Sequence, residues 1–300
     1  MVADGPAVAA LPRIVREPGC RLQPARGADD GWRALLICLG LSEPAPGVIT
    51  GSPMFATALL LSASTLYAEA IGGYSAGCLK NAVALPLEGP GYQVIRTKRL
   101  RYYGHPDLIH YLQHLANQTR LAGMPDLYIA DLAMMHGGPF TSGHRSHQTG
   151  LDADIWFRMA DRPISRWEQD APREWALIDE PSYRMLPGRF GPRQLNLLRL
   201  AADQPEVARI FVNPVIKAEV CKQAPGEAWV AKLRPWVGHF SHFHVRLRCP
   251  ANSPDCQPQA PIPPGNGCGE ELASWLKDKP QLPKVSMSYR APLLPRRCEG

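Results

Sequence analysis

The stretch His144-Arg145-Ser146-His147-Gln148-Thr149-Gly150-Leu151-Asp152-Ala153-Asp154 brings histidines, aspartates and a turn-forming glycine close together in the chain. Apolar and polar residues alternate over 151–157, which predicts a β-strand with Asp152 and Asp154 on one face. The glycine that precedes this strand allows the loop to turn back, because glycine adopts conformations that other residues avoid. The sequence therefore predicts a strand that carries two carboxylates, preceded by a loop that carries His147.

A second histidine cluster, His239-Phe240-Ser241-His242-Phe243-His244, leads into a predicted strand over 243–247. His242 and His244 are two residues apart in the sequence. On a strand both imidazoles point to the same face, while Phe243 points to the other.

The two clusters together predict a metal site. Two adjacent strands can present Asp154 and His244 to one point, with His147 reaching in from its loop. Imidazole and carboxylate are usual ligands of a catalytic zinc ion, which takes three protein ligands and leaves one position for water. His242 is then placed to act as a base or to stabilise the transition state.

The pattern leaves three assignments open. Asp152 shares a strand face with Asp154, so either carboxylate fits as the ligand. His144 could serve as a fourth ligand, could bond to one of the ligands, or could be exposed to solvent. His239 could be structural, or its side chain could face the substrate.

Other catalytic signatures do not account for these residues. Ser146 adjoins His147 but does not lie in a G-x-S-x-G elbow, so we expect no serine triad. The sequence contains no HExxH motif, P-loop or dinucleotide fingerprint. The net charge of +6 is scattered over the chain without a basic stripe, so we expect no nucleic-acid partner.

The first seventy residues have the features of a leader and a signal peptide and not those of a folded domain. Residues 1–53 are rich in Pro, Gly and Arg, and we interpret them as a leader or as an extension upstream of the true start. Residues 54–70 resemble a signal peptide, with an apolar run followed by the cleavage motif Ala68-Glu69-Ala70. We therefore expect one mature domain over 71–300. No apolar run reaches about 18 residues, so no membrane span is expected.

The mature region predicts an α+β fold with a small antiparallel sheet, flanking helices and long loops. Residues 160–192 are rich in proline and are interpreted as a long insertion. Apolar periodicity and helix-start signals predict the remaining elements. The expected strands are 93–96, 127–134, 151–157, 209–212 and 243–247, and the expected helices are 193–202, 214–221, 270–276 and one that begins at Pro106-Asp107.

The eight cysteines indicate disulfides. None forms a CxxC pair, which argues against a cysteine-rich structural zinc site. Six of them follow residue 70 in a loop-rich region, which favours an oxidising compartment. Composition alone does not choose among the possible pairings.

The chain resembles the penicillin-insensitive murein endopeptidases over about residues 71–298. This family belongs to a wider group of zinc peptidases that includes lysostaphin, the D-Ala-D-Ala peptidases and the hedgehog fold. The wider group's pattern, a His, six residues, an Asp and a later His-x-His, matches His147, Asp154 and His242-Phe243-His244. The narrower family motifs are IGGYSAGC at 71–78, RYYGHPD at 101–107, SHQTGLD at 146–152, RIFVNP at 209–214 and HVRLRCP at 244–250.

The resemblance implies a role for each site residue. It implies zinc ligands at His147, Asp154 and His244, a catalytic role for His242 and a possible additional metal contact at His144. It also implies the lysostaphin/hedgehog-like fold and three disulfides, Cys78–Cys298, Cys221–Cys268 and Cys249–Cys256. Cys20 and Cys38 have no counterpart in the family. A second metal site known in the family is doubtful, because residues 159–191 contain no histidine.

The resemblance further implies a periplasmic enzyme that acts on cross-linked peptidoglycan, with Zn²⁺ as cofactor. We expect hydrolysis of the amide between D-alanine and meso-diaminopimelate by a water that the zinc activates. One alternative is a D,D-carboxypeptidase with the same site. Another is a non-catalytic wall-binding module that keeps the zinc as a structural ion. The oligomeric state is not predicted.

Overall fold

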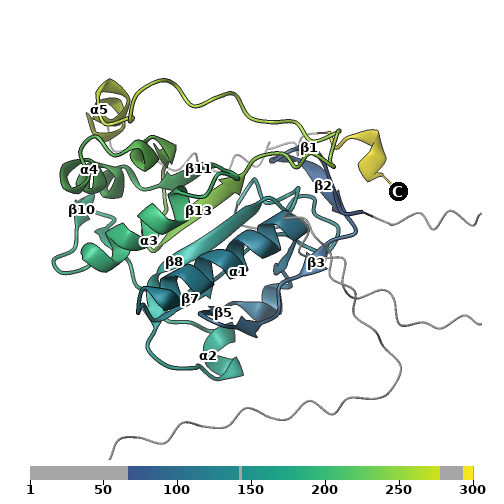
Figure 1. Ribbon diagram of the computed structural model, residues 1–300, viewed down its shortest axis with the longest axis horizontal. Helices are drawn as coiled ribbons and strands as arrows, with labels where there is room; N and C mark the ends of the chain where they lie inside the picture. Colours follow the sequence, from purple (N-terminus) through teal and green to yellow (C-terminus); the bar gives the residue numbers. More distant parts are fainter. Residues whose placement is uncertain (1–66, 142–143, 278–292, 300) are drawn as a thin grey trace, which may run out of the picture. The chain divides into compact units, whose positions relative to one another are not determined.

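The computed structural model describes residues 67–141, 144–277 and 293–299 (Figure 1). The expected leader at 1–53 and most of the expected signal peptide at 54–70 lie outside these residues. Glu69 and Ala70, which cleavage after the Ala-x-Ala motif would remove, belong to strand β1 (Glu69–Gly73), and Ala70 is fully buried. The position of the processing site therefore stays a prediction.

A seven-stranded sheet forms the centre of the fold (Figure 1). Its strand order is β12-β11-β13-β8-β7-β5-β4. Strands β8 and β13 lie in the middle and pair antiparallel. The strands are β4 (Glu88–Gly89), β5 (Tyr92–Val94), β7 (Asp126–Ile129), β8 (Asp152–Ala160), β11 (Val207–Val212), β12 (Leu233–Pro235) and β13 (His242–Leu247).

The α+β class is confirmed, but the sheet is mixed and larger than predicted. Strands β5 and β7 pair parallel, and so do β11 and β12. Each parallel pair is joined through a helix, α1 (Pro106–Leu121) for the first and α4 (Pro214–Gln223) for the second. Parallel neighbours need such a crossover connection, whereas antiparallel strands can be joined by a tight turn. Both helices were predicted from the sequence, but the parallel pairing of the strands that they connect was not.

The expected strand over 127–134 is wrong in its second half. Strand β7 ends at Ile129, Ala130 and Asp131 still bond to the Asp154 backbone, and the chain then turns to another partner. The Leu132 N–H donates to the Arg101 carbonyl, and Ala133 pairs with Tyr103. Apolar alternation continues through this segment because it is buried against a different partner.

The predicted insertion after β8 has structure of its own. It contains the short helix α2 (Arg166–Asp170) and the hairpin β9 (Ile178–Asp179) and β10 (Arg184–Met185). A further hairpin pairs β1 with β2 (Ala76–Lys80), and β3 (Val83–Ala84) pairs antiparallel with β6 (Tyr103–Gly104), which lies further along the chain. None of the helices described in the structure is long and apolar enough to cross a membrane.

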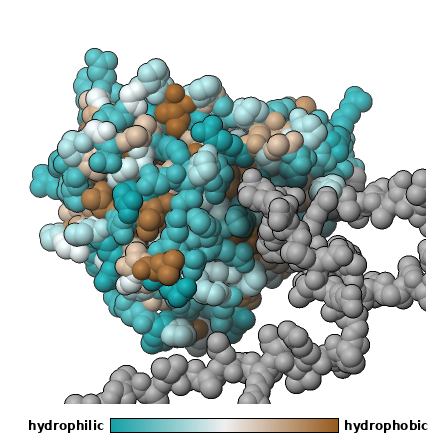
Figure 2. All heavy atoms as spheres, viewed as in Figure 1, coloured by the Kyte–Doolittle hydropathy of each residue, from teal (hydrophilic) through white to brown (hydrophobic). Residues whose placement is uncertain are grey.

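The hydrophobic core lies between one face of the sheet and the helices α1 and α3 (Pro192–Ala202), which Figure 1 shows side by side in front of the strands. Phe157 of β8 and Phe243 of β13 meet in this core with ring centroids 5.3 Å apart. Figure 2 views the molecule from this helix side, whose surface is mainly hydrophilic. Because side chains alternate along a strand, the polar residues of β8 and β13 face away from these helices.

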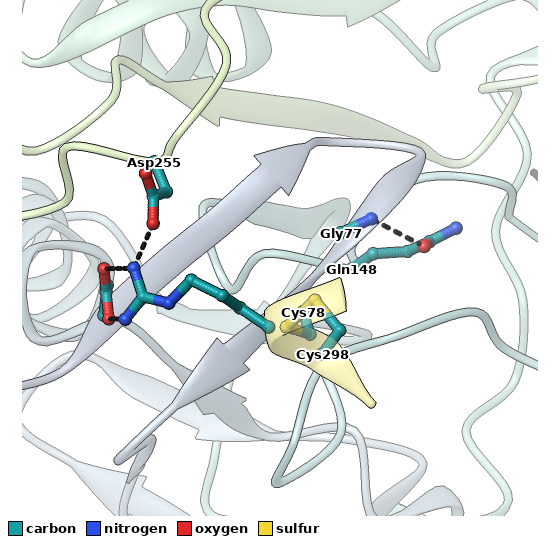
Figure 3. Close-up of a disulfide and its surroundings, with 7 residues drawn as sticks. Gly77, Cys78, Gln148, Asp255 and Cys298 are labelled. Carbon is teal, nitrogen blue, oxygen red and sulfur yellow. Dashed lines mark hydrogen bonds and ion pairs between the residues drawn. A yellow bond between two sulfur atoms is a disulfide. The ribbon is translucent and has the colours of Figure 1, made fainter. Parts of the chain in front are cut away.

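Three disulfides close the chain, with the pairing that the family resemblance implied. Cys221 is bonded to Cys268, and Cys249 to Cys256. Cys78 of β2 is bonded to Cys298, 220 residues away, next to Arg297 (Figure 3). Arg297 also forms ion pairs with Glu69 and Asp255. The segment 293–299 is therefore held against the β1–β2 hairpin by a covalent bond and by charge.

We expect replacement of both Cys78 and Cys298 by Ser to destabilise the protein more than replacement of both Cys249 and Cys256. Sequence separations of 220 and 7 correspond to about 5 and about 2 kcal/mol in the chain-entropy account of disulfides. Urea unfolding followed by tryptophan fluorescence measures both losses. A larger loss in the short-loop variant would contradict the expected order.

Candidate metal centre and active site

Four potential metal ligands converge on the polar face of the central strands. Asp154 of β8 and His244 of β13 are direct partners in the antiparallel ladder. His144 and His147 join them from the loop that precedes β8. One ligand atom from each residue lies within 4.8 Å of the other three. The structure therefore brings together every residue that the sequence analysis considered as a ligand except Asp152.

The Asp154 carboxylate is at the centre of this cluster. Its Oδ2 lies 3.1 Å from His144 Nε2, and its Oδ1 lies 3.5 Å from His147 Nε2 and 3.4 Å from His244 Nδ1. Three imidazoles thus surround one buried carboxylate. Imidazole nitrogen and carboxylate oxygen are the donor types that zinc takes in catalytic sites.

Several polar atoms of the cluster are buried and have no hydrogen-bond partner among the described residues. They are both ring nitrogens of His147 and Oδ1 of Asp154. Leaving a buried polar group unsatisfied costs about 1–3 kcal/mol, so such groups are rare unless something else satisfies them. A cation bound here would satisfy Asp154 Oδ1 and one of the two His147 nitrogens, and the donor set fits such an ion.

The loop holds His147 in an unusual conformation. Its φ angle is 70°, in the left-handed region that residues other than glycine seldom adopt. The neighbouring Gln148 fixes this geometry by bonding to the β1–β2 hairpin (Figure 3). The Gly77 N–H donates to Gln148 Oε1 at 3.2 Å, and Gln148 Nε2 donates to the Ser75 carbonyl at 2.9 Å. Strained backbone of this kind is concentrated at functional sites.

Asp152 does not enter the cluster, although it shares a strand face with Asp154. Its Oδ1 accepts from His244 Nε2 at 2.9 Å and from Arg246 Nε at 2.7 Å. Its Oδ2 accepts from the His147 backbone N–H at 3.0 Å. Because His244 donates through Nε2, its Nδ1 lone pair faces the cluster. Asp152 thus orients two of the possible ligands.

His242 lies beside the cluster and outside the set of four. Its side chain is 18% exposed, and its Nε2 is 3.8 Å from Asp154 Oδ1. The His239 ring lies 5.0 Å from the His242 ring, and His239 Nδ1 is 2.9 Å from the Val237 carbonyl. His242 is therefore partly exposed, while its buried Nε2 lies near the central carboxylate and the His239 ring packs against its ring.

A model of the penicillin-insensitive murein endopeptidase family matches residues 70–300. The chain belongs to this family. A penicillin-insensitive murein endopeptidase of Klebsiella pneumoniae subsp. pneumoniae is 44% identical over 237 residues, covering 78% of this chain and 85% of the relative. One of Haemophilus influenzae is 46% identical over 222 residues, covering 74% and 77%. One of Yersinia enterocolitica is 44% identical over 231 residues, covering 76% and 83%. This membership makes the chain a peptidase.

The charges around the cluster act differently on its members. Burial raises the pKa of Asp154, but His144 and His147 outweigh it and hold that pKa well below its usual value. Asp154 favours protonated His144, yet burial and the other imidazoles lower the His144 pKa to about 4. Burial also lowers the pKa of His242. Burial lowers the pKa of His244 as well, but Asp152 and Asp154 outweigh it and raise that pKa. A metal ion binds ionised carboxylate and neutral imidazole, so binding at a protonated His244 would displace a proton.

Three residues contribute to this site although the sequence predicted no role for them. Arg246 follows His242 and His244 on the same face of β13, so strand alternation contained the signal. Gln148 and Phe211 lie within the family motifs at 146–152 and 209–214, but periodicity and spacing assigned them no role. Phe211 is the ladder partner of His244, and its ring lies 5.3 Å from the His244 ring.

One motif match was also overlooked. Gly73-Tyr74-Ser75-Ala76-Gly77 fits the G-x-S-x-G pattern. It lies at the turn of the β1–β2 hairpin and not at a strand-to-helix turn, which a nucleophile elbow requires. The expectation that no serine triad operates therefore stands on structural context and not on absence of the pattern.

We expect Asp152→Asn to weaken divalent-metal binding about 10- to 100-fold, as loss of a carboxylate partner of a ligating histidine commonly does. The amide cannot accept from His244 and Arg246 as a carboxylate does. Competition with a chromophoric chelator measures the affinity. Asp126→Asn is the matched control, because Asp126 bonds Gln93 on the other side of β8. Equal affinity in the two variants would contradict the role of Asp152.

Proposed function

We propose that this chain is a zinc-dependent endopeptidase that hydrolyses the amide between D-alanine and meso-diaminopimelate in the cross-links of peptidoglycan. The observation that carries the proposal is the cluster of three imidazoles around the Asp154 carboxylate. Its support from outside the structure is membership of a family whose relatives are named murein endopeptidases.

Zinc is a metal that this donor set suits. His147, Asp154 and His244 would hold it, and His144 would supply an additional contact. Hard cations such as calcium and magnesium prefer oxygen ligands, whereas this cluster offers mainly imidazole nitrogen. When bound, zinc supplies a Lewis acid that polarises the scissile carbonyl and makes water nucleophilic near neutral pH.

His242 would carry the proton transfer. Its Nε2 is buried without a partner among the described residues and points toward the central carboxylate. A neutral imidazole at this position can accept a proton at Nε2 from the attacking water. Once protonated, the same atom can donate a hydrogen bond to the developing oxyanion or pass its proton to the leaving amine.

We also propose the lysostaphin/hedgehog-like fold and a periplasmic location. The fold is supported by the antiparallel pair β8–β13, which carries the Asp and the His-x-His of that group's pattern. The location is supported by three disulfides, which indicate an oxidising compartment outside the cytoplasm. Cross-linked peptidoglycan is the substrate that such a compartment offers.

The first test is digestion of purified cross-linked muropeptide dimers, analysed by mass spectrometry. We expect conversion of dimers to monomers that EDTA abolishes and added Zn²⁺ restores. Penicillin should not inhibit, because no serine acyl-enzyme forms in a reaction of this type. Release of terminal D-alanine with dimers left intact would indicate a D,D-carboxypeptidase. Zinc binding without any turnover would indicate a non-catalytic module, and activity that survives full chelation would refute the mechanism.

The second test separates binding the metal from moving the proton. We expect His244→Ala to lose most of its zinc and its activity, because the side chain would be a ligand. We expect His242→Ala to keep its zinc and to lose activity by about 100- to 10,000-fold, the range that general acid–base groups contribute. Metal analysis of the purified variants and dimer turnover measure the two quantities. Equal loss of zinc in both variants would rule out this division of roles.

A further inference from the structure

A run of aromatic rings leads away from the metal centre along one edge of the sheet. The Phe211 ring lies 5.3 Å from His244, and the Trp236 ring lies 5.8 Å from Phe211. The Trp275 ring of helix α5 (Glu270–Lys277) lies 5.8 Å from Trp236. The run therefore begins on a residue that we propose as a zinc ligand and continues outward.

The rings of this run are accessible to solvent. Trp236 is 49% exposed, and Phe211 and Trp275 are partly exposed. None of the three belongs to the buried core. Exposed tryptophan is costly to leave in water and is enriched where proteins bind ligands. These rings lie outside the core and form one continuous run that starts at His244, which distinguishes them from a singly exposed aromatic residue and points to binding.

The outer part of the run is held rigidly. The Cys221–Cys268 disulfide ties the segment before α5 to α4. Arg234 of β12 forms an ion pair with Glu271 of α5, and Lys217 Nζ donates to the Asn266 carbonyl at 2.6 Å. A surface fixed in this way loses little conformational entropy when it binds.

We infer that Phe211, Trp236 and Trp275 form a subsite for a sugar ring of the glycan strand that carries the substrate peptide. The inference rests on the proposed function. The negative face of an aromatic ring attracts partly positive C–H groups, and a sugar ring presents such a face. The subsite would bind substrate away from the scissile amide, and such remote binding energy can be used to raise the rate of reaction.

The reach of the substrate matches the length of the run. Four residues of a stem peptide separate the D-alanyl amide from the sugar, and four extended residues span about 14 Å. The three ring-to-ring steps from His244 to Trp275 are 5.3, 5.8 and 5.8 Å. A sugar attached to a peptide in the site can therefore reach the two tryptophans.

The local charges favour a neutral sugar over the carboxylates of the peptide. Arg234, the cation nearest in sequence to Trp236, is buried in its pair with Glu271. Lys217 is buried and donates to the Val230 and Asn266 carbonyls. Arg246 lies over one face of the Phe211 ring, 5.0 Å from its centroid, but is buried and bonded to Asp152. None of these three cations is presented to an incoming anion.

The test compares two cross-linked dimers, one that carries its disaccharides and one from which an amidase has removed them. The measured quantity is the ratio of kcat/KM for the sugar-bearing dimer to that for the sugar-free dimer. We expect this ratio to be about 10 or more in the wild type, as for loss of a single aromatic anchor. Trp236→Ala and Trp275→Ala should each bring the ratio toward 1, whereas Trp236→Phe should keep most of it.

Trp167→Ala is the matched control, because Trp167 is 74% exposed on α2, away from this run. Its ratio should equal that of the wild type. A wild-type ratio near 1, an unchanged ratio in both Trp236→Ala and Trp275→Ala, or an equal fall in Trp167→Ala would overturn the subsite. Failure of the wild type to cleave either dimer would instead overturn the proposed function.

Discussion

The pairing of Asp154 with His244 across β8 and β13 is the constraint on which the rest of the site depends. Side chains alternate along a strand, so a slip of one residue would turn either side chain toward the helices. Phe157 and Phe243 prevent such a slip, because they must stay in the core on the opposite face. The apolar packing of one face thus fixes the chemistry of the other.

The two carboxylates of β8 have different electrostatic roles. Asp154 meets the imidazoles, while Asp152 lies fully buried among donors and orients them. Arg246 neutralises Asp152, and its guanidinium packs over the Tyr74 ring at 4.2 Å. A buried charge needs partners of this quality, because desolvation otherwise outweighs its attraction to a counter-ion. The aspartates are two residues apart in the sequence, and their different surroundings separate their functions.

Much of this arrangement was predictable, and the limits have physical causes. Alternation predicted both central strands and the shared face of His242 and His244. It could not choose between Asp152 and Asp154, because their difference lies in partners distant in sequence. The parallel strand pairs were missed because periodicity describes one segment and not its neighbour. Gln148 was missed because its role depends on a hairpin some seventy residues earlier in the chain.

The bond between Cys78 and Cys298 also bears on how the protein is made. A ribosome delivers the chain from one end, and Cys298 follows Cys78 by 220 residues. His244 likewise follows Asp152 by 92 residues. During synthesis the loop around His147 therefore exists long before its partner strand and before the clamp on the hairpin that supports it. The order of emergence alone delays assembly of the cluster until nearly all of the described chain has been produced.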